Sequence, residues 1–333
     1  MPPQRSPAHP PFTRERHSHV RRPPSTPALP EKPKRSRTGL FVGIGIAVVA
    51  VIVAVVLVVV NLTGSGAATA KSVTVKIGTT EASSPYWAVL KKEAAKEGID
   101  IQTVNFRDYT QANPALADGQ LDLNLFQHLQ FLANYDVQAK QNLVPIGATL
   151  VVPLPLYSTK HTSLDDIPQG GKIAIPNDPT NQARALLVLQ KAGLLKLKNG
   201  GSTLATPADI DAAASKVTVI PVDAAQTAPA LSSADGAIIN NNYALTAGID
   251  PKSALFQDDP KSETAEPYIN AFVAREKDKD NPTYLKIAKL YHTKAVTDAV
   301  LAESKNTAVI VNRPESDLIG ILDDLKKTIE AAQ

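Results

Sequence analysis

A ten-residue segment in the middle of the chain combines a helix start with an arginine. Residues 175–184 read IPNDPTNQAR. Asp178 is a good N-cap, and Pro179 suits the first helical position, where its missing N–H costs nothing. Asn181 and Arg184 are three residues apart and therefore share one face of the first turns. Because a helix N-terminus carries free N–H groups and partial positive charge, a guanidinium there favours binding of a carboxylate.

Two other predicted strand ends carry polar and aromatic side chains. The strand predicted at residues 121–126 runs into a glutamine and a histidine, and the strand that begins at residue 237 runs into three asparagines and a tyrosine. Ligands of open α/β sheets bind beyond the carboxyl ends of the strands. The candidate ligand-binding residues at these ends, with one tyrosine nearby in sequence, are Tyr109, Phe126, His128 and Asn240.

Each candidate also has a purely structural interpretation. Arg184 alone is consistent with a capped helix that carries a surface arginine, and any one of Tyr109, Phe126 and His128 is consistent with core packing. The combination of a carboxylate site, an amide cluster and an aromatic wall nevertheless favours one pocket. Such a pocket suits an amino acid with an apolar side chain.

No arrangement of residues indicates catalysis. The chain has no G-x-S-x-G, P-loop or H-E-x-x-H motif, and it has no cysteine, which excludes disulfides, thiolate metal sites and a cysteine nucleophile. Beyond residue 38 the histidines are His128, His161 and His292, far apart and without a neighbouring carboxylate motif. The adjacent pair Asp258-Asp259 is typical of a turn or a helix cap. We therefore expect a protein that is not an enzyme and has no metal or cofactor.

The elements that position these residues alternate between strands and helices, which predicts an α/β fold with parallel sheets covered on both faces. About 250 residues of this pattern suit two lobes better than one sheet. The predicted strands are residues 73–78, 99–106, 121–126, 172–176, 217–221, 237–240 and 268–275, and residues 143–153 are predicted to be extended. The predicted helices are residues 85–98, 112–118, 128–141, 181–192, 282–291, 294–303 and 315–332.

The first 62 residues predict a single-pass membrane protein. Residues 1–38 contain nine Lys or Arg, two Glu and ten Pro, and are predicted to be a disordered basic tail. Residues 39–60 contain no polar side chain and, as a helix, would span ~33 Å, enough to cross a bilayer. The predicted transmembrane helix is residues 39–62 and the linker is residues 63–72. The positive-inside rule places the tail in the cytoplasm and the remainder of the chain outside.

Two motifs after the apolar run bear on attachment. The run is longer than the core of a secretory signal, which favours an anchor, whereas Ala68-Thr69-Ala70 resembles a signal-peptidase site and leaves cleavage after Ala70 open. Residues 62–65 resemble a bacterial lipobox in which Ser65 replaces the lipidated cysteine, so a thioether lipid is excluded. The chain after residue 38 has 26 basic and 30 acidic residues, and it lacks the basic stripe that nucleic-acid binding requires.

Four segments resemble the NlpA family of methionine-binding lipoproteins. They are residues 104–128, 175–198, 237–244 and 267–275, and the resemblance extends over roughly residues 73–305. The I-P-N-D-P-T-N-x-x-R and F-Q-H segments are specific to that family. The resemblance implies a two-lobed periplasmic-binding-protein fold with the ligand cleft between the lobes.

The resemblance also implies lobe boundaries and a role for each candidate residue. Lobe 1 is expected at residues 73–152 and 247–310, lobe 2 at residues 153–246, and a C-terminal amphipathic helix at residues 311–333. In this family the arginine matching Arg184 takes the ligand carboxylate, and asparagines matching Asn181 and Asn240 bind its polar end. The aromatic residues that surround the thioether chain match Tyr109, Phe126 and His128.

The sequence thus predicts a membrane-tethered, extracytoplasmic solute-binding protein that captures methionine or a related apolar amino acid. It would deliver this ligand to an ABC permease with a cytoplasmic ATPase. The alternative is a membrane-anchored sensor that signals through partners of the cytoplasmic tail. L-methionine, D-methionine, a methionyl dipeptide and other apolar amino acids all stay open, because one methylene is worth only ~1–3 kcal/mol in an apolar pocket.

Overall fold

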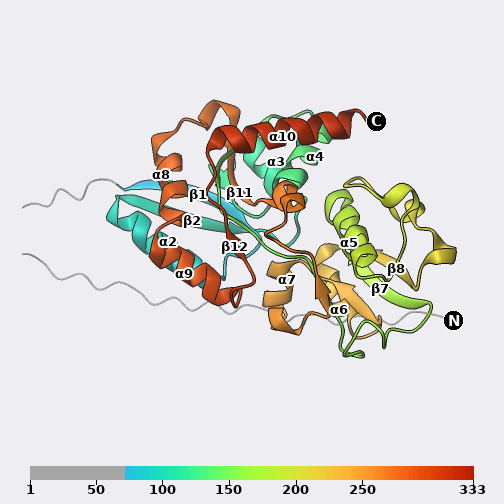
Figure 1. Cartoon of the computed structure of the whole chain (residues 1–333). Coiled ribbons are helices and arrows are strands. Elements are labelled where there is room, and N and C mark those ends of the chain that lie inside the picture. Colours follow the sequence, from blue (N-terminus) through green and yellow to red (C-terminus); the bar gives the residue numbers. More distant parts are fainter. Residues whose placement is uncertain (1–71) are drawn as a thin grey trace, which may run out of the picture. The chain divides into compact units, whose positions relative to one another are not determined.

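Two five-stranded sheets organise residues 72–333, the part of the chain that this computed structural model describes (Figure 1). The strand orders are β2-β1-β3-β11-β4 and β10-β6-β9-β7-β8. Each sheet and its covering helices form one lobe, here named lobe 1 and lobe 2. The predicted tail, transmembrane helix and all but the last residue of the linker lie outside the described residues. Within residues 72–333, no helix is both long and apolar enough to cross a membrane.

Lobe 1 has a sheet covered by helices on both faces. Its strands are β1 (Val73–Thr79), β2 (Ile99–Asn105), β3 (Leu123–Asn124), β4 (Leu143–Ala148) and β11 (Ala271–Arg275), and β5 (Leu150–Val151) pairs separately with β12 (Val309–Ile310). Its helices are α2 (Pro85–Lys96), α3 (Ala112–Ala117), α4 (Leu129–Ala139), α8 (Pro282–Tyr291), α9 (Lys294–Glu303) and α10 (Glu315–Glu330). Along β11, Phe272 and Ala274 join one core cluster and Val273 joins the other. This alternation shows that both faces of the sheet are buried.

Lobe 2 is smaller and has more short turns of helix. Its strands are β6 (Pro155–Tyr157), β7 (Gly171–Pro176), β8 (Val217–Val222), β9 (Gly236–Ile238) and β10 (Phe256–Gln257), and its α-helices are α5 (Pro179–Lys191), α6 (Thr227–Ala230) and α7 (Asn241–Thr246). The 3-10 turns of the two lobes are η1 (Lys198–Gly200), η2 (Pro207–Asp209), η3 (Ala212–Ala214), η4 (Ala224–Gln226), η5 (Pro251–Ser253), η6 (Glu263–Tyr268) and η7 (Glu276–Asp278). Helix α5 covers one face of the sheet, and α6 and α7 cover the other.

Both five-stranded sheets are mixed, so the prediction of parallel sheets is wrong for one strand in each of them. Strand β11 is antiparallel to β3 and β4, and β6 is antiparallel to β9 and β10. These two strands are the first that the chain forms after it crosses from the other lobe. Because a crossing chain enters a lobe at the cleft, where the parallel strands end, the entering strand runs in the opposite direction.

The chain crosses between the lobes twice, and the predicted return to lobe 1 at residue 247 is wrong. Strand β10 pairs with β6 in lobe 2, with Phe256 opposite Leu156. Lobe 2 therefore continues to Gln257. A strand of two residues is too short to show an alternating pattern, so it cannot be predicted from periodicity. We name the crossings connection 1 (residues 152–154) and connection 2 (residues 258–262).

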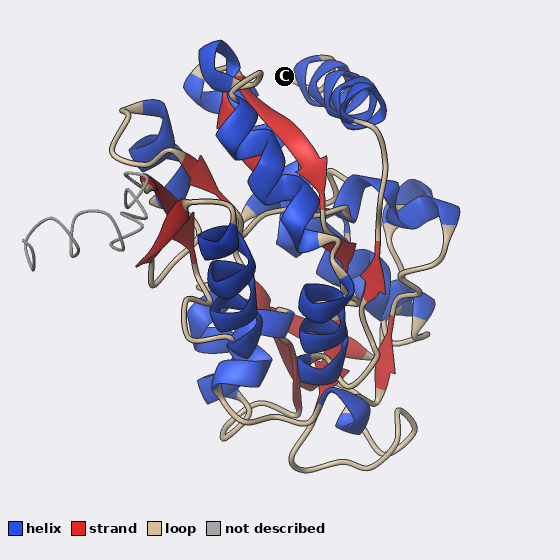
Figure 2. Ribbon diagram, turned by 90° about the vertical axis from the view of Figure 1, so that its left-hand side faces the viewer, coloured by secondary structure: helices blue, strands red, loops and turns tan. Residues whose placement is uncertain are grey.

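The C-terminal helix α10 packs on lobe 1. Its buried side chains are Leu318, Leu322 and Ile329, which follow the helical spacing that the sequence shows. Leu322 and Ile329 join the core cluster of α3, α4 and β4. The helix lies at the edge of the molecule with its outer face in solvent (Figure 1, Figure 2). It therefore extends the core of lobe 1 on one side.

Shortening Leu322 to alanine should lower the free energy of unfolding by about 2–5 kcal/mol, because the side chain is 1% exposed and its removal leaves a cavity. Denaturant titration followed by circular dichroism measures this loss. Asp323→Ala, on the exposed side of the same helix, should change the free energy by less than about 0.5 kcal/mol. Equal effects of the two substitutions would mean that α10 is not part of the folded core.

Candidate ligand-binding site

One cavity lies between the two lobes, and all six predicted ligand-binding residues line it. They are Tyr109, Phe126, His128, Asn181, Arg184 and Asn240. The cavity holds about 900 Å³ of empty space, including its open mouth. It sits beyond the carboxyl ends of β3, β7 and β9, where an α/β sheet is expected to bind a ligand. Three segments far apart in the sequence thus meet at one place.

The start of α5 has the predicted cap. The Asp178 carboxylate accepts a hydrogen bond from the backbone N–H of Asn181 at 3.0 Å, and Pro179 is the first helical residue. The same carboxylate accepts from Nδ2 of Asn181 at 3.0 and 3.1 Å. Burial raises the pKa of Asp178, while the hydrogen bonds from Asn181 and Thr180 lower it. The cap therefore also fixes the Asn181 side chain.

The orientation of the two asparagine amides follows from this cap. An ionised carboxylate only accepts hydrogen bonds, so Asn181 must turn its NH₂ group to Asp178 and its Oδ1 away from it. Asn181 Oδ1 then accepts a hydrogen bond from Nδ2 of Asn240 at 2.8 Å. Asn240 Oδ1 is left buried and, among the described residues, without a hydrogen-bond partner. A ligand that donates a hydrogen bond to Oδ1 of Asn240 would satisfy the last acceptor in this series of hydrogen bonds.

Arg184 is buried rather than on the surface, with a side chain that is 4% exposed. Its Nε donates to Oδ2 of Asp258 at 2.8 Å, and its Nη2 donates to the backbone oxygen of Val152, also at 2.8 Å. The guanidinium carbon lies 4.0 Å from the centre of the Tyr268 ring. Asp258 is a further residue of the site, although its place beside Asp259 in the sequence is typical of a turn or a cap. No spacing links it to Arg184, since 74 residues separate them.

The aromatic wall is larger than the sequence indicates. The ring centres of Tyr109 and Phe126 are 6.1 Å apart, and both rings also contact Phe131, at 5.9 and 5.8 Å. Tyr243 from lobe 2 lies 5.2 Å from Tyr109. Phe131 is five residues after Phe126 on α4, and nothing in the sequence distinguishes it from a core residue.

His128 belongs to the wall as an uncharged ring. It caps α4, since its Nδ1 accepts a hydrogen bond from the backbone N–H of Phe131 at 3.1 Å. The proton of the neutral ring is thereby placed on Nε2, which lies 3.5 Å from Oδ1 of Asn181. Burial, and next the positive charge of Arg184, lower the pKa of His128 to about 3. The ring therefore contributes surface and one donor but no charge at neutral pH.

A cluster of three buried amides supports the strand end that carries Phe126 and His128. Asn113 Nδ2 donates to Oε1 of Gln127 at 2.7 Å, and Gln127 Nε2 donates to Oδ1 of Asn113 at 2.6 Å. Asn124 Nδ2 donates to Oδ1 of Asn113 at 2.9 Å. Because each amide is paired with the others, the segment after β3 has one preferred conformation.

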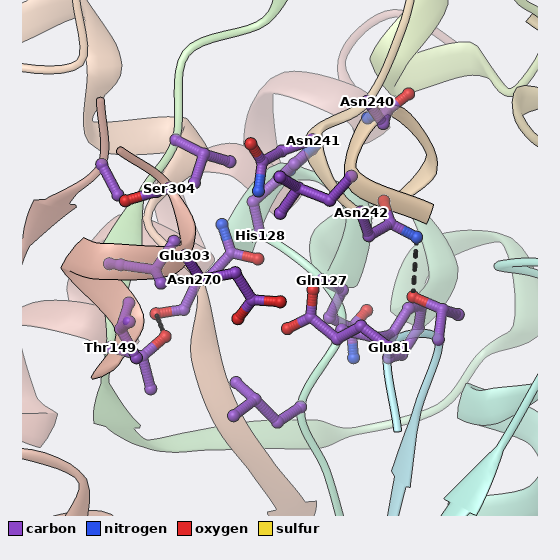
Figure 3. A pocket seen from close by; sticks show the side chains of 18 of the residues that line it. Glu81, Gln127, His128, Thr149, Asn240, Asn241, Asn242, Asn270, Glu303 and Ser304 are labelled. Atoms are coloured by element: carbon purple, nitrogen blue, oxygen red, sulfur yellow. Dashed lines mark hydrogen bonds between the residues drawn. The ribbon is translucent and has the colours of Figure 1, made fainter. Parts of the chain in front are cut away.

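Hydrogen bonds also join the lobes across the mouth of the cavity. Tyr109 in lobe 1 donates to Oδ1 of Asn242 in lobe 2 at 2.5 Å. Asn242 Nδ2 donates to Oγ1 of Thr80 at 3.2 Å, the dashed line at Asn242 in Figure 3. Tyr243 donates to the backbone oxygen of Arg107 at 3.1 Å. Asn242 thus bridges the lobes in this structure.

Two glutamates line the cavity on its lobe 1 side. Their carboxyl groups point toward one another in Figure 3. Glu81 Oε1 accepts a hydrogen bond from the hydroxyl of Tyr86 at 2.7 Å. The pKa of Glu81 is raised to about 7. Burial is the main cause and the charge of Glu303 adds to it, while the hydrogen bond from Tyr86 acts in the opposite direction. Within residues 72–333 no cluster of three or more His, Cys, Asp or Glu residues is arranged to hold a metal ion.

The NlpA lipoprotein family is matched by residues 75–312 of the chain. The chain belongs to this family. The D-methionine-binding lipoprotein MetQ of Salmonella typhi is 37% identical over 230 residues, which are 68% of this chain and 83% of the relative. Helix α10 begins after the matched residues.

Solved structures of similar chains have the same fold. The NlpA protein is 39% identical to a nutrient-binding protein of Burkholderia cenocepacia bound to methionine, with a TM-score of 0.66 over 71% of this chain and 99% of that one. It is 38% identical to a periplasmic substrate-binding protein of an ABC transporter from Coxiella burnetii, with a TM-score of 0.66 over 71% and 100% of the two chains. The two-lobed α/β fold predicted from the sequence is confirmed.

Replacing Glu81 with glutamine should make stability less dependent on pH. The folded pKa of about 7 is above the ordinary value of 4.5, so the stability contributed by protonated Glu81 is present below pH 4.5 and lost as the pH rises through about 7. Glutamine keeps an acceptor for Tyr86 and does not titrate. Relative to the wild type, the free energy of unfolding of Glu81→Gln should rise between pH 4.5 and 7 and be constant below pH 4.5. Urea titrations at several pH values measure it, and a difference that is the same at all pH values would contradict the shift.

Proposed function

We propose that the described body binds methionine, or a closely related apolar amino acid, as the extracytoplasmic substrate-binding component of an ABC importer. One observation carries this proposal. A single cavity between the lobes combines a buried arginine, an unpaired amide oxygen and an aromatic wall. An α-amino acid with an apolar side chain has the three complementary groups: a carboxylate, an ammonium and an apolar chain. Relatives named for binding D-methionine or methionine support the choice of ligand.

Each group of the ligand has a proposed partner. Arg184 binds the carboxylate. The residue lines the cavity, and only two of its five N–H groups are used, by Asp258 and Val152, so the others remain for the ligand. The ammonium donates to the buried Oδ1 of Asn240, and Asn181 orients that amide. The apolar chain lies against the wall of Tyr109, Phe126 and His128, which line the cavity. A thioether gains from such contacts, because sulfur packs favourably against aromatic rings.

Capture of the ligand is proposed to be a hinge motion. The chain passes between the lobes at connections 1 and 2. Contacts between the lobes must break for the cavity to open, among them the hydrogen bonds of Asn242 and Tyr243 and the ion pair of Lys305 with Asp250. The ligand contacts both lobes, so it favours the closed arrangement by its differential contacts. The closed lobes would then present the ligand to the permease.

The rival functions have no comparable support. Membership of a family of substrate-binding proteins agrees with the prediction that the chain is not an enzyme. The sensor alternative depended on partners of the basic tail, and nothing in the described body or among the relatives favours it.

Attachment through residues 39–62 is a separate proposal. The relatives are named lipoproteins, whereas this chain has Ser65 where a lipidated cysteine is needed. The uncharged run of residues 39–60 is long enough to hold the protein in the membrane. We propose that it does so with residues 1–38 in the cytoplasm and the binding body outside.

The attachment proposal makes a direct prediction about the mature N-terminus. The full-length protein should sediment with membranes, keep residues 1–38 and take up no radiolabelled fatty acid. N-terminal sequencing and metabolic labelling measure these properties, with a Ser65→Cys variant as a positive control for lipid labelling. A mature chain that starts at Lys71 would overturn the anchor and leave the binding site unaffected.

Arg184→Ala should weaken methionine binding by about 2–5 kcal/mol, because a ligand carboxylate would be desolvated without its charged partner. Isothermal calorimetry with L-methionine, D-methionine and leucine measures the affinity and tests the proposed function. Arg313→Ala is the control, since Arg313 pairs with Glu266 at 2.6 Å away from the cavity. Circular dichroism checks that both variants fold. Wild-type protein that binds none of the three amino acids would reject the proposed function, and near wild-type affinity in Arg184→Ala would remove Arg184 from the site.

A further inference from the structure

The guanidinium of Arg184 is held by both connections between the lobes. Its Nη2 donates to the backbone oxygen of Val152 in connection 1, and its Nε donates to Oδ2 of Asp258 in connection 2. The other carboxylate oxygen of Asp258 accepts from the backbone N–H of Leu154 at 2.7 Å. These three hydrogen bonds close a ring that contains the start of α5 and both crossings of the chain.

These three hydrogen bonds fix the direction of the guanidinium as well as its position. Tyr268 lies against one face of the guanidinium, with 4.0 Å between its ring centre and Cζ. Nε donates to Asp258 and Nη2 donates to Val152. Among the described residues, neither N–H group of Nη1 has a partner, so the edge of the guanidinium that contains Nη1 is free. Planar guanidinium groups bind carboxylates through such an edge.

We propose that Asp258 is a positioning residue for ligand binding: it orients Arg184 so that the free edge of the guanidinium meets the ligand carboxylate. This inference rests on the proposed function, because it assumes an amino-acid ligand at Arg184. Asp258 is well suited to the task, since its side chain is only 20% exposed and both of its oxygens are used. Its negative charge also compensates the buried arginine before a ligand arrives.

A positioning role and a simple charge effect predict opposite changes in the preference for a carboxylate ligand when Asp258 is replaced. Without Asp258, a mobile guanidinium would lose its contact with the ligand carboxylate, and the preference for a carboxylate would fall. If Asp258 only competed with the ligand for the positive charge, its removal would raise that preference. If it only supported the fold, ligands with and without a carboxylate would be affected equally.

The test uses Asp258→Asn in the full-length protein and two ligands, methionine and its uncharged-carboxyl analogue methioninamide. Asparagine can still accept from Leu154 and has nearly the same shape. Calorimetry gives the affinity of each ligand, and the ratio of the two affinities reports on the carboxylate contact alone. Asp259→Asn is the matched control, because it removes the same charge from an exposed neighbour whose side chain accepts only from the backbone N–H of Lys261.

We expect Asp258→Asn to weaken methionine binding about tenfold or more and to lower the ratio of methionine to methioninamide affinity by a similar factor. Asp259→Asn should leave both affinities within about twofold of the wild type. An unchanged or increased ratio in Asp258→Asn, with wild-type binding of methionine intact, would overturn the positioning role. Failure of the wild type to bind methionine would instead reject the proposed function.

Discussion

A buried positive charge has to be compensated where it lies, and the centre of this molecule is arranged around one such charge. Arg184 is almost fully enclosed, so water stabilises its charge much less than it would at the surface. Its neighbours are therefore a carboxylate, a backbone oxygen and the face of a tyrosine ring. The first two come from the segments that join the lobes. The buried charge is therefore compensated at the two connections between the lobes.

The polar side of the cavity depends on a second constraint, the direction of hydrogen bonds. Asp178 can only accept, and this fixes the amide of Asn181, which in turn fixes the amide of Asn240. The result is a free acceptor on Asn240, before α7, and a free guanidinium edge on Arg184, in α5. A zwitterion needs this combination, because its ammonium donates to an acceptor and its carboxylate binds a cation. The aromatic side needs less precision, because ring surfaces tolerate ligands of similar shape.

Local signals predicted the helix start at Asp178 and Pro179 and the pattern of strands and helices, since capping and periodicity involve neighbouring residues. The convergence of three strand ends followed from the general behaviour of α/β sheets. Asp258 and Asn242 were not predicted as site residues, because their partners lie 74 and 133 residues away. Short strands such as β10 were missed for a related reason: their pairing depends on the sheet they join and leaves no pattern of their own.

Both ends of the described body belong to lobe 1. It begins with β1 in the sheet of lobe 1 and ends with α10 packed on the core of the same lobe. Lobe 2 is thus an insertion between connections 1 and 2, and neither end of the body is part of it. A force or a tether acting on the N-terminal side is transmitted to lobe 1 alone. Lobe 1 can then serve as a stationary frame, and lobe 2 can swing without displacing the point of attachment or doing work against it.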